Sequence, residues 1–514
     1  MPDAVTVDAP GAKGFRRALF WCGVAAMICL ASAAVLSWLL APFASYETRT
    51  YGQFEFFARI GEAFPWLQGR KDDGLPAWRW GLQLAFRSRG LMEDRRLFLA
   101  TYGLPLMAAS LAALGAVGSA WRHRLALQPS DADRALRWGV VFALLLIPAV
   151  PVLVPDFWLS VAWGRTLAAG INPYYEVPAA ATSWLPLDSP LMHMTYGPLW
   201  AYVSAAIMWV TGGHALWGAL LFKLVLAAAW IGLLCVVRGL VRDRAPFEQV
   251  LAVIMVAWLP IGVVQTVGDG HNDVAMVGCA LLWMYFRRTG RPMAATAALT
   301  ASVLFKYASA PLFLLDALYR EPEESRDVSR FVRAYLPRAA LAAVLTVAAF
   351  APIFRGLDFF ATTSEVHGGH FYLPSDAVLA VVELTGAPLR FLAYVAVGIF
   401  PLLTVLELYR YLRDGGGRLR EAGAAVMMSM LLLGASHAWP WYVIWFVALA
   451  ALVPTSAYGR WAMGLALAMP FPLLAWTVAP YADELKRFYL PSLLAYGLAL
   501  GWFLVIRWRP ARTS

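Results

Sequence analysis

The sequence predicts an all-α polytopic membrane protein, a bundle of about 12–14 transmembrane helices with further helices at the outer surface. Two observations predict this fold class. Of the 514 residues, 61% are hydrophobic and only 14% are charged, whereas about a quarter of the residues in soluble proteins are charged. Apolar windows long enough to span a membrane, about 20 residues each, recur from Phe20 to Ile506. A single membrane body is therefore expected.

The first element is an apolar run from Ala18 to Phe43 that follows Lys13, Arg16 and Arg17. It is too long for the core of a signal peptide, so we expect a retained first span. Residues 44–97 mix charges with many aromatic side chains. This composition predicts a pair of amphipathic helices at the outer membrane surface.

Clusters of arginine mark the turns that the positive-inside rule places in the cytoplasm. They are Arg122–Arg137, Arg238–Arg244, Arg287–Arg291, Arg320–Arg338, Arg410–Arg420, Arg460 and Arg507–Arg512. Both termini are then cytoplasmic. The net charge of +10 is a topology signal of this kind, and no nucleic-acid partner is expected. The cysteines lie in apolar windows without metal-ligand spacing, which predicts neither a disulfide framework nor a zinc site.

Three segments with almost no Lys or Arg are expected to face outward: 156–214, where Arg165 is the only basic residue, 268–273 and 436–441. The short apolar stretch 198–210 is interpreted as a helix in the outer leaflet, since a full crossing would put Arg238 on the wrong side. The stretches 293–305 and 308–319 are interpreted as two crossings that meet near Lys306 on the outer side.

The first outward segment carries a possible catalytic acid. Asp156 follows an apolar span and precedes Trp163-Gly164-Arg165, then Asn172-Pro173-Tyr174 and Tyr196. These residues could form a shaped loop around an active site. The alternative is that Asp156 is a solvated carboxylate and the aromatic residues belong to the ordinary interfacial belt.

The second outward segment is Asp269-Gly270-His271-Asn272-Asp273, between two apolar windows. Its acids, imidazole and amide could hydrogen-bond sugar hydroxyls. Asp156, Asp269 and Asp273 could instead share a divalent metal ion, and no metal is required by the pattern. The alternative to both is a polar turn exposed to water.

Cations inside or beside apolar windows are the third set of candidates. Lysine inside a membrane costs several kcal/mol unless it is paired or hydrated. Lys223 could reach water at the interface, whereas Lys306-Tyr307 lies at a helix break, which favours an anionic headgroup as its ligand. Arg355 is a candidate for phosphate because its planar donors match phosphate oxygens. His437 and Trp441 are further candidates in the last outward segment.

At these residues the sequence resembles the C-type (GT-C) glycosyltransferases, and in particular bacterial membrane mannosyltransferases that use a polyprenyl-phosphate sugar. The resemblance rests on five motifs in the family's order. They are Asp156–Tyr174, Tyr196–Leu199, Gly270–Asp273, Phe305–Tyr307 and Trp441–Trp445. One position departs from the pattern, because Ala162 stands where related sequences often carry a second acid. The resemblance implies a GT-C-like core over 137–514, with 1–136 as a two-helix membrane extension.

The resemblance further implies that Asp156 is the general base of an inverting hexosyl transfer, with mannose as the most favoured sugar. The donor would be a polyprenyl-phosphate sugar and the acceptor a glycan or glycolipid, in the bacterial inner membrane with the active site facing the periplasm or exterior. Substrate-binding roles are expected for Arg165, Asn172, Tyr174, Tyr196, His271, Asn272, Asp273, Lys306, Tyr307, Arg355, His437 and Trp441.

The alternative function is a secondary transporter or a flippase for lipid-linked sugars. Such a protein would carry its polar groups near the bilayer midplane, commonly with internal repeats. Here the polar groups lie at the outer ends of the predicted helices and no repeat is evident. These observations favour the enzyme.

Overall fold

The computed structural model describes most of the chain, and every structural statement below concerns that part. The described residues are 10–40, 103–151, 156–178, 192–318, 328–356, 359, 373–387, 391–414, 417–434, 438–472 and 489–506. The predicted amphipathic pair at 44–97 lies outside these residues.

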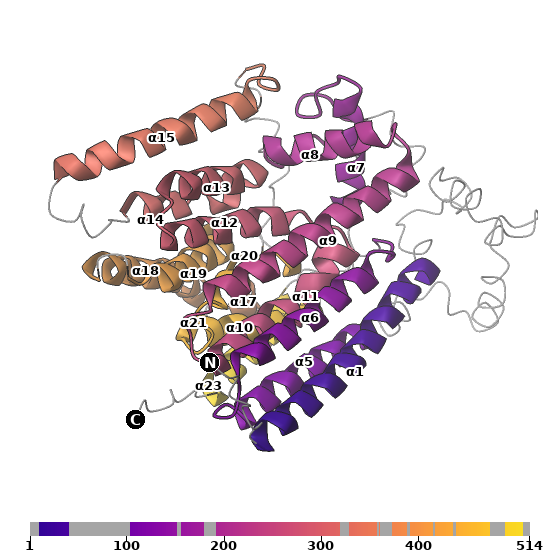
Figure 1. The fold of residues 1–514 in the computed structure, drawn as a ribbon, viewed down its shortest axis with the longest axis vertical. Coiled ribbons are helices and arrows are strands. Elements are labelled where there is room, and N and C mark those ends of the chain that lie inside the picture. Colours follow the sequence, from indigo (N-terminus) through magenta and orange to yellow (C-terminus); the bar gives the residue numbers. More distant parts are fainter. Residues whose placement is uncertain are drawn as a thin grey trace, which may run out of the picture.

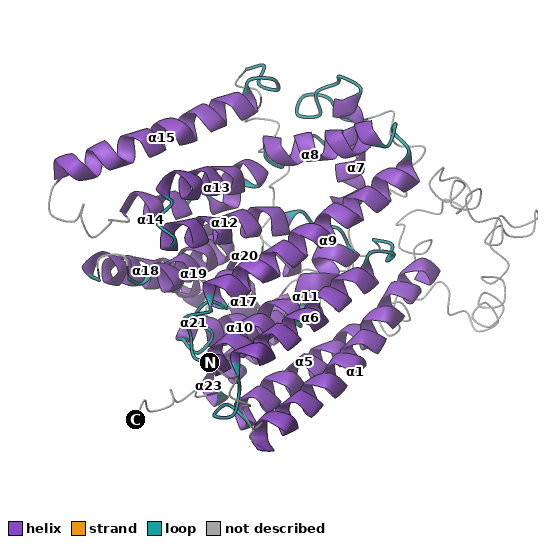
Figure 2. Cartoon of the chain, viewed as in Figure 1, coloured by secondary structure: helices purple, strands orange, loops and turns teal. Residues whose placement is uncertain are grey.

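The described part of the chain is built from helices and contains no strand, which confirms the predicted all-α class (Figures 1 and 2). In chain order, the helices of the first half are α1 (Pro10–Leu40), α5 (Leu104–Arg122), α6 (Pro129–Leu146), α7 (Asp156–Ala168), α8 (Pro198–Val210), α9 (Ala215–Leu240), α10 (Pro246–Ala257), α11 (Pro260–Val263), the π-helix η5 (Val264–Gly268) and α12 (Asp273–Arg288). Those of the second half are α13 (Pro292–Phe305), η6 (Tyr307–Ser309), α14 (Leu312–Leu318), α15 (Val328–Phe350), α17 (Pro374–Thr385), α18 (Phe391–Arg413), α19 (Leu419–Ser429), η8 (Met430–Gly434), η9 (Pro440–Val443), α20 (Ile444–Ala450), α21 (Ala457–Ala468) and α23 (Leu490–Val505).

Helices from the two ends of the chain form one packed bundle. In Figure 1, α1, α5, α6 and α9 run side by side in a layer, and α1 packs against both α5 and α6. The face of α5 that is buried there carries alanines at 109, 113, 116 and 120, and such small side chains let membrane helices approach closely. Farther along the chain, α12 packs on α9 and α13, and α20 packs on α12 and α19.

Four described helices are long and apolar enough to cross a membrane by themselves: Gly11–Ser37, Leu104–Arg122, Leu216–Leu240 and Val332–Phe350. The pair Pro246–Ala257 and Pro260–Gly268, bent by 46°, would be a fifth span if it crosses as one unit. Other helices, including α12 and α13, are shorter than the about 20 residues that a simple crossing needs. The protein is therefore a polytopic membrane protein, and the figure of about 14 crossings stays a prediction.

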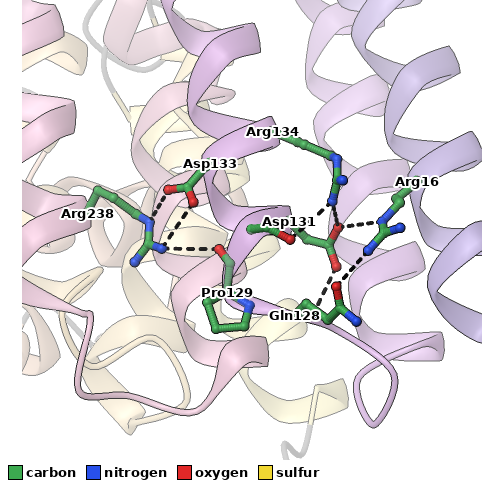
Figure 3. Close-up of polar contacts among 8 residues, drawn as sticks. Arg16, Gln128, Pro129, Asp131, Asp133, Arg134 and Arg238 are labelled. Carbon is green, nitrogen blue, oxygen red and sulfur yellow. Dashed lines mark hydrogen bonds and ion pairs between the residues drawn. The ribbon is translucent and has the colours of Figure 1, made fainter. Parts of the chain in front are cut away.

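Arginine clusters that are far apart in the sequence meet at one end of this bundle. On α1, Arg16 donates to Asp131 Oδ1 at 2.9 Å, and Arg238, in the last turn of α9, donates to Asp133 Oδ1 at 2.7 Å (Figure 3). Arg288, at the end of α12, and Arg420, at the start of α19, both pair with Asp243. We call this the basic end, defined by Arg16, Asp131, Asp133, Arg238, Asp243, Arg288 and Arg420.

Two local predictions can be compared with the helices. Pro198–Val210 is a separate helix of 13 residues, too short for a simple crossing, as expected. The break at Lys306 is also present, because Lys306 has an extended backbone between α13 and η6. The predicted domain boundary after residue 136 falls within α6, and the division into an extension and a core stays a prediction.

Candidate functional site

The outward motifs predicted from the sequence lie together at the end of the bundle opposite the basic end. Asp156 begins α7 and Asp273 begins α12, whereas Lys306 follows the last residue of α13. The helix α12 runs from Asp273 to Arg288. Asp273 therefore lies one helix length away from Arg288, which belongs to the basic end. We call this group the site end, defined by Asp156, Tyr196, His271, Asn272, Asp273, Lys306 and Trp441.

Asp156 is the partly open member of the site end, with 26% of its side chain exposed. Its Oδ2 accepts a hydrogen bond from the Tyr196 hydroxyl at 2.8 Å and lies 3.5 Å from His271 Nδ1. Burial raises the pKa of Asp156, but the nearby His271, Tyr196 and Lys306 lower it by more, so it lies below the ordinary value of 3.8. The carboxyl group is therefore ionised at neutral pH.

Tyr196 serves as a neutral donor to this carboxylate. Burial and the neighbouring Asp156 raise the pKa of the Tyr196 phenol well above 10, so it keeps its proton. Its position is fixed by the next residue, since the backbone N–H of Gly197 donates to Phe305 O at 3.1 Å. A Cβ on Gly197 would lie 2.1 Å from Leu304 O, so only glycine permits this approach to the end of α13.

The turn before α12 brings His271 to Asp156. The π-helix η5 ends at Gly268, and the chain then turns through Gly270, whose φ is +82°. A Cβ there would lie 2.2 Å from the Phe157 ring, so the turn packs directly against the residue that follows Asp156. This contact explains why a glycine is needed between Asp269 and His271.

Lys306 and Asp273 form an almost buried ion pair, with Nζ 2.7 Å from Oδ1 and side chains 11% and 2% exposed. Trp445 Nε1 donates to the same carboxylate oxygen. The Lys306 amine also lies 4.2 Å from the ring centre of Tyr442 and 5.1 Å from those of Tyr196 and Trp445. This aromatic cage stabilises the cation and holds it near Asp156.

An aromatic stack covers the other side of His271. The imidazole lies parallel to the ring of Trp441, with centroids 4.3 Å apart, and Trp441 in turn stacks on Trp439 at 5.1 Å. The stack fixes the plane of the imidazole and excludes water from that face.

Several polar atoms at the site end are buried without a hydrogen-bond partner in the described structure. They are Nε2 of His271, whose Nδ1 lies beside Asp156 at 3.5 Å, both amide atoms of Asn272, Oδ2 of Asp273 and Nε1 of Trp441. Buried polar atoms are nearly always paired, and each exception needs an explanation. A concentration of such atoms on consecutive residues beside an ionised carboxylate is the expected property of a site that hydrogen-bonds a ligand.

Two predicted substrate-binding residues have their hydrogen-bonding groups engaged within the protein. Asn172 Nδ2 donates to Ile353 O at 2.7 Å, and its Oδ1 accepts from the Tyr174 backbone. The Tyr174 hydroxyl donates to Tyr196 O at 2.7 Å. These hydrogen bonds join the loop after α7 to the segment after α15 and to the backbone of Tyr196. Both residues therefore help to hold Tyr196 in position.

The remaining predicted residues lie outside the group around Asp156. Arg165 is nine residues farther along α7, about 14 Å from the start of the helix. Arg355 is 57% exposed and lies 3.7 Å from Glu176. Tyr307 follows Lys306, and its buried hydroxyl has no described partner. His437 lies outside the described residues.

The sequence left open a metal ion shared by Asp156, Asp269 and Asp273. Among the described residues, no three His, Cys, Asp or Glu side chains form a group that could hold a metal ion. Asp269 is fully buried and its Oδ2 accepts from Gln265 Nε2 at 2.8 Å. The use of a metal ion stays a possibility raised by the sequence.

Tyr442 and Trp445 contact Lys306 and Asp273 but were not singled out as site residues from the sequence. Their spacing of three places them on one face of the turn where η9 passes into α20. An aromatic pair at this spacing directly after Trp441 was the available signal. It became specific only once Lys306, which follows α13, was seen to lie beside Trp445 of α20.

Comparisons with known proteins agree with the motifs. Residues 73–318 match a family model described as alpha-(1->6)-mannopyranosyltransferase, N-terminal domain. The chain is 25% identical over 332 residues to alpha-(1->6)-mannopyranosyltransferase A of Mycobacterium tuberculosis, covering 61% of this chain and 64% of that protein. It is 25% identical over 203 residues to the protein of the same name from Corynebacterium glutamicum, covering 37% and 40%.

The matches thus span less than two thirds of either relative's length. The residues matched by the family model include most of the site end, from Asp156 to Lys306. The comparisons confirm the resemblance to GT-C-type bacterial membrane mannosyltransferases that the sequence motifs indicate.

Proposed function

We propose that this chain is an inverting membrane mannosyltransferase, which transfers mannose from a polyprenyl-phosphate donor to a hydroxyl of a glycan or glycolipid. The starting point is the resemblance to enzymes named alpha-(1->6)-mannopyranosyltransferases. The observation that carries the proposal is the set of unpartnered polar atoms on His271, Asn272 and Asp273 beside the ionised Asp156. A pyranose supplies several hydroxyls, each able to donate and accept, and so matches such a set.

In the proposed reaction Asp156 is the general base. The acceptor hydroxyl attacks the anomeric carbon on the face opposite the phosphate, the bond from that carbon to the phosphate oxygen breaks, and the hydroxyl proton passes to Asp156. A carboxylate with a lowered pKa suits a late proton transfer, after positive charge has developed on the sugar. Tyr196, which donates to Oδ2 at 2.8 Å, orients the carboxylate for this step.

The leaving group is the lipid phosphate, whose developing charge must be stabilised. Lys306 is the candidate cation near Asp156, since both contact Tyr196. Lys306 is paired with Asp273 and enclosed by aromatic rings. It would donate a hydrogen bond to the phosphate while keeping this ion pair. Arg165 and Arg355, which are exposed, stay candidates for parts of the substrates that lie farther from the reacting carbon.

The location of the site at helix ends supports an enzyme over a transporter. Asp156 and Asp273 begin helices and Lys306 follows one, whereas transport sites lie near the bilayer midplane between repeats. With the basic end in the cytoplasm, the site end faces the periplasm or exterior of a bacterial inner membrane. Nucleotide sugars are absent there, so a lipid-linked donor is the consistent source of mannose.

The test is to reconstitute the purified protein with a panel of polyprenyl-phosphate sugars and a mannoside acceptor, and to analyse the products by mass spectrometry and by anomeric NMR. We expect a mannosylated product from the polyprenyl-phosphate mannose alone, with inverted anomeric configuration. Transport of an intact lipid-linked sugar without a new glycosidic bond would overturn the proposal, and a product with retained configuration would overturn the mechanism.

A further inference from the structure

A lysine that the proposed reaction does not use lies inside the bundle close to the site end. Lys223 is the ninth residue of α9, about 12 Å from the start of that helix, and its side chain is only 3% exposed. It does not reach water at the interface, which the sequence left open. An amine this deep in a membrane helix needs specific partners.

Its partners are the carbonyl oxygens at the end of the bent helix pair. Lys223 Nζ donates to Val267 O and Gly268 O, the last two residues of η5. The last carbonyls of a helix have no partner within it, and an amine there also opposes the negative end of the helix dipole. Asp269, which follows directly and is fully buried, interacts electrostatically with the same amine.

The carbonyls that Lys223 binds begin the turn that carries the site. Asp269 N donates to Val264 O at 2.7 Å and His271 N donates to Gln265 O at 3.0 Å, so the turn is built on η5. On its other side Gly270 packs against Phe157, whose ring centre lies 5.9 Å from Lys223 Nζ. Lys223 thus contacts both the turn that places His271 and the residue that follows Asp156.

We propose that Lys223 is a positioning residue, which caps η5 and thereby holds His271, Asn272 and Asp273 in register with Asp156. The inference rests on the proposed function for its kinetic consequence but not for its structural one. Without the amine, two carbonyls and the Asp269 carboxylate lose their common partner. The turn then departs from its position, and a displacement of about 1 Å at a reacting group can reduce turnover about 10²-fold.

The test compares Lys223→Met, the double variant Lys223→Met/Asp269→Asn and the control Leu226→Met, in the full-length protein purified in detergent. Leu226 is buried one turn along the same helix, and Leu226→Met changes apolar packing without removing a charge or a side-chain hydrogen bond. The double variant carries no uncompensated buried charge, so it folds even if Lys223→Met alone does not. The amide oxygen that it introduces at position 269 can still accept from Gln265.

Two measurements are made on each variant. In mannosyl transfer, we expect both Lys223 variants to lower kcat at least about tenfold, with the donor KM nearly unchanged and Leu226→Met close to wild type. In hydrogen exchange, we expect the amides of residues 269–273 to exchange at least about tenfold faster in both Lys223 variants. The exchange measurement needs no activity, so an inactive wild-type protein would refute the proposed function while leaving this inference testable.

A double variant with wild-type kcat would overturn the inference, and so would unchanged protection of residues 269–273. A loss expressed through KM alone would also contradict it, because a positioning residue acts on the reacting groups rather than on donor binding.

Discussion

The two ends of the bundle differ in how completely their buried polar side chains are hydrogen-bonded. At the basic end, Arg238 donates to Asp133 and Pro129 O, and Asp131 accepts from Arg16, Arg134 and the Gln128 backbone (Figure 3). Arg238 also donates to Gln249. At the site end, His271 and Asn272 are just as deeply buried, yet Nε2 of His271 and both amide atoms of Asn272 have no described hydrogen-bond partner.

The difference indicates what each end contributes. Hydrogen bonds between helices at the basic end fix how α1, α6 and α9 pack, so those residues stabilise the fold. The polar atoms at the site end that lack a described partner add no such bond between helices, and a ligand that pairs with them offsets their desolvation. Substitutions at the two ends should therefore separate stability from activity.

The largest effect is expected for a buried ion pair in the half of α12 that leads to the basic end. Asp316 on α14 accepts from Arg287 at 2.8 Å and from Trp283 at 2.6 Å, and both charged side chains are almost completely buried. Arg287→Met leaves the Asp316 charge uncompensated and should cost about 3–5 kcal/mol of unfolding free energy. Denaturant titration of the detergent-solubilised protein measures this, and an unchanged midpoint would contradict the role given to the pair.

The next largest effect is expected at the site end, where a substitution should lower activity without lowering stability. Asn272→Leu removes two unpaired atoms and no hydrogen bond, and Asn272 does not cap α12 with its side chain. We expect the melting temperature to stay unchanged or rise, while mannosyl transfer falls about 10²–10³-fold because substrate hydrogen bonds are lost. A variant that melts earlier but keeps its activity would show that Asn272 is structural.

A smaller effect is expected in the pH dependence of Tyr196→Phe. The change removes the hydrogen bond that helps to keep the pKa of Asp156 below 3.8, so that pKa rises. Activity needs the ionised carboxylate, is complete above its pKa and is lost as pH falls through it. The acid limb of the rate profile should therefore move to higher pH.

The matched control is Tyr202→Phe, which removes a hydrogen bond to Ala349 O instead and should leave the acid limb in place. If Tyr196→Phe also left the limb in place, the titrating group would be a residue other than Asp156.

The smallest effect is expected at the edge of the basic end. Asp133 is 55% exposed and pairs with Arg238, which is largely buried. Because Arg238 keeps its hydrogen bonds to Gln249 and Pro129 O, losing the exposed partner should cost at most about 1 kcal/mol. Asp133→Asn should lower the unfolding free energy by no more than this and leave transfer at the wild-type rate. A substantial loss of transfer would mean that the two ends are coupled.

Much of this organisation could be predicted from the sequence because the signals are local. Apolar windows predicted an all-α membrane fold, and arginine clusters such as Arg238–Arg244 and Arg287–Arg291 predicted which loops share one end. The extended residue between α13 and η6 was predicted from Lys306, since a charged residue between two short apolar stretches favours a break.

The contacts that decide each residue's role depend on packing between distant helices and could not be predicted. Asn172 was expected to bind substrate and Lys223 to be able to reach water, and in the structure both donate to backbone carbonyls. Lys306 was expected to meet a phosphate, and no local pattern indicated that Asp273, Tyr442 and Trp445 from other helices enclose it. Which polar groups remain unpaired is known only after every backbone partner has been assigned.

The central claim is that Asp156 is the base of a glycosyl transfer at the site end, and Asp156→Asn tests it most directly. The change keeps the size of the side chain and an acceptor for the Tyr196 hydroxyl, but removes the proton-accepting carboxylate. Under single-turnover conditions with polyprenyl-phosphate mannose, we expect the rate to fall about 10²–10⁴-fold, with donor binding retained and Asp133→Asn as the matched control. Transfer by Asp156→Asn at the wild-type rate would contradict the account.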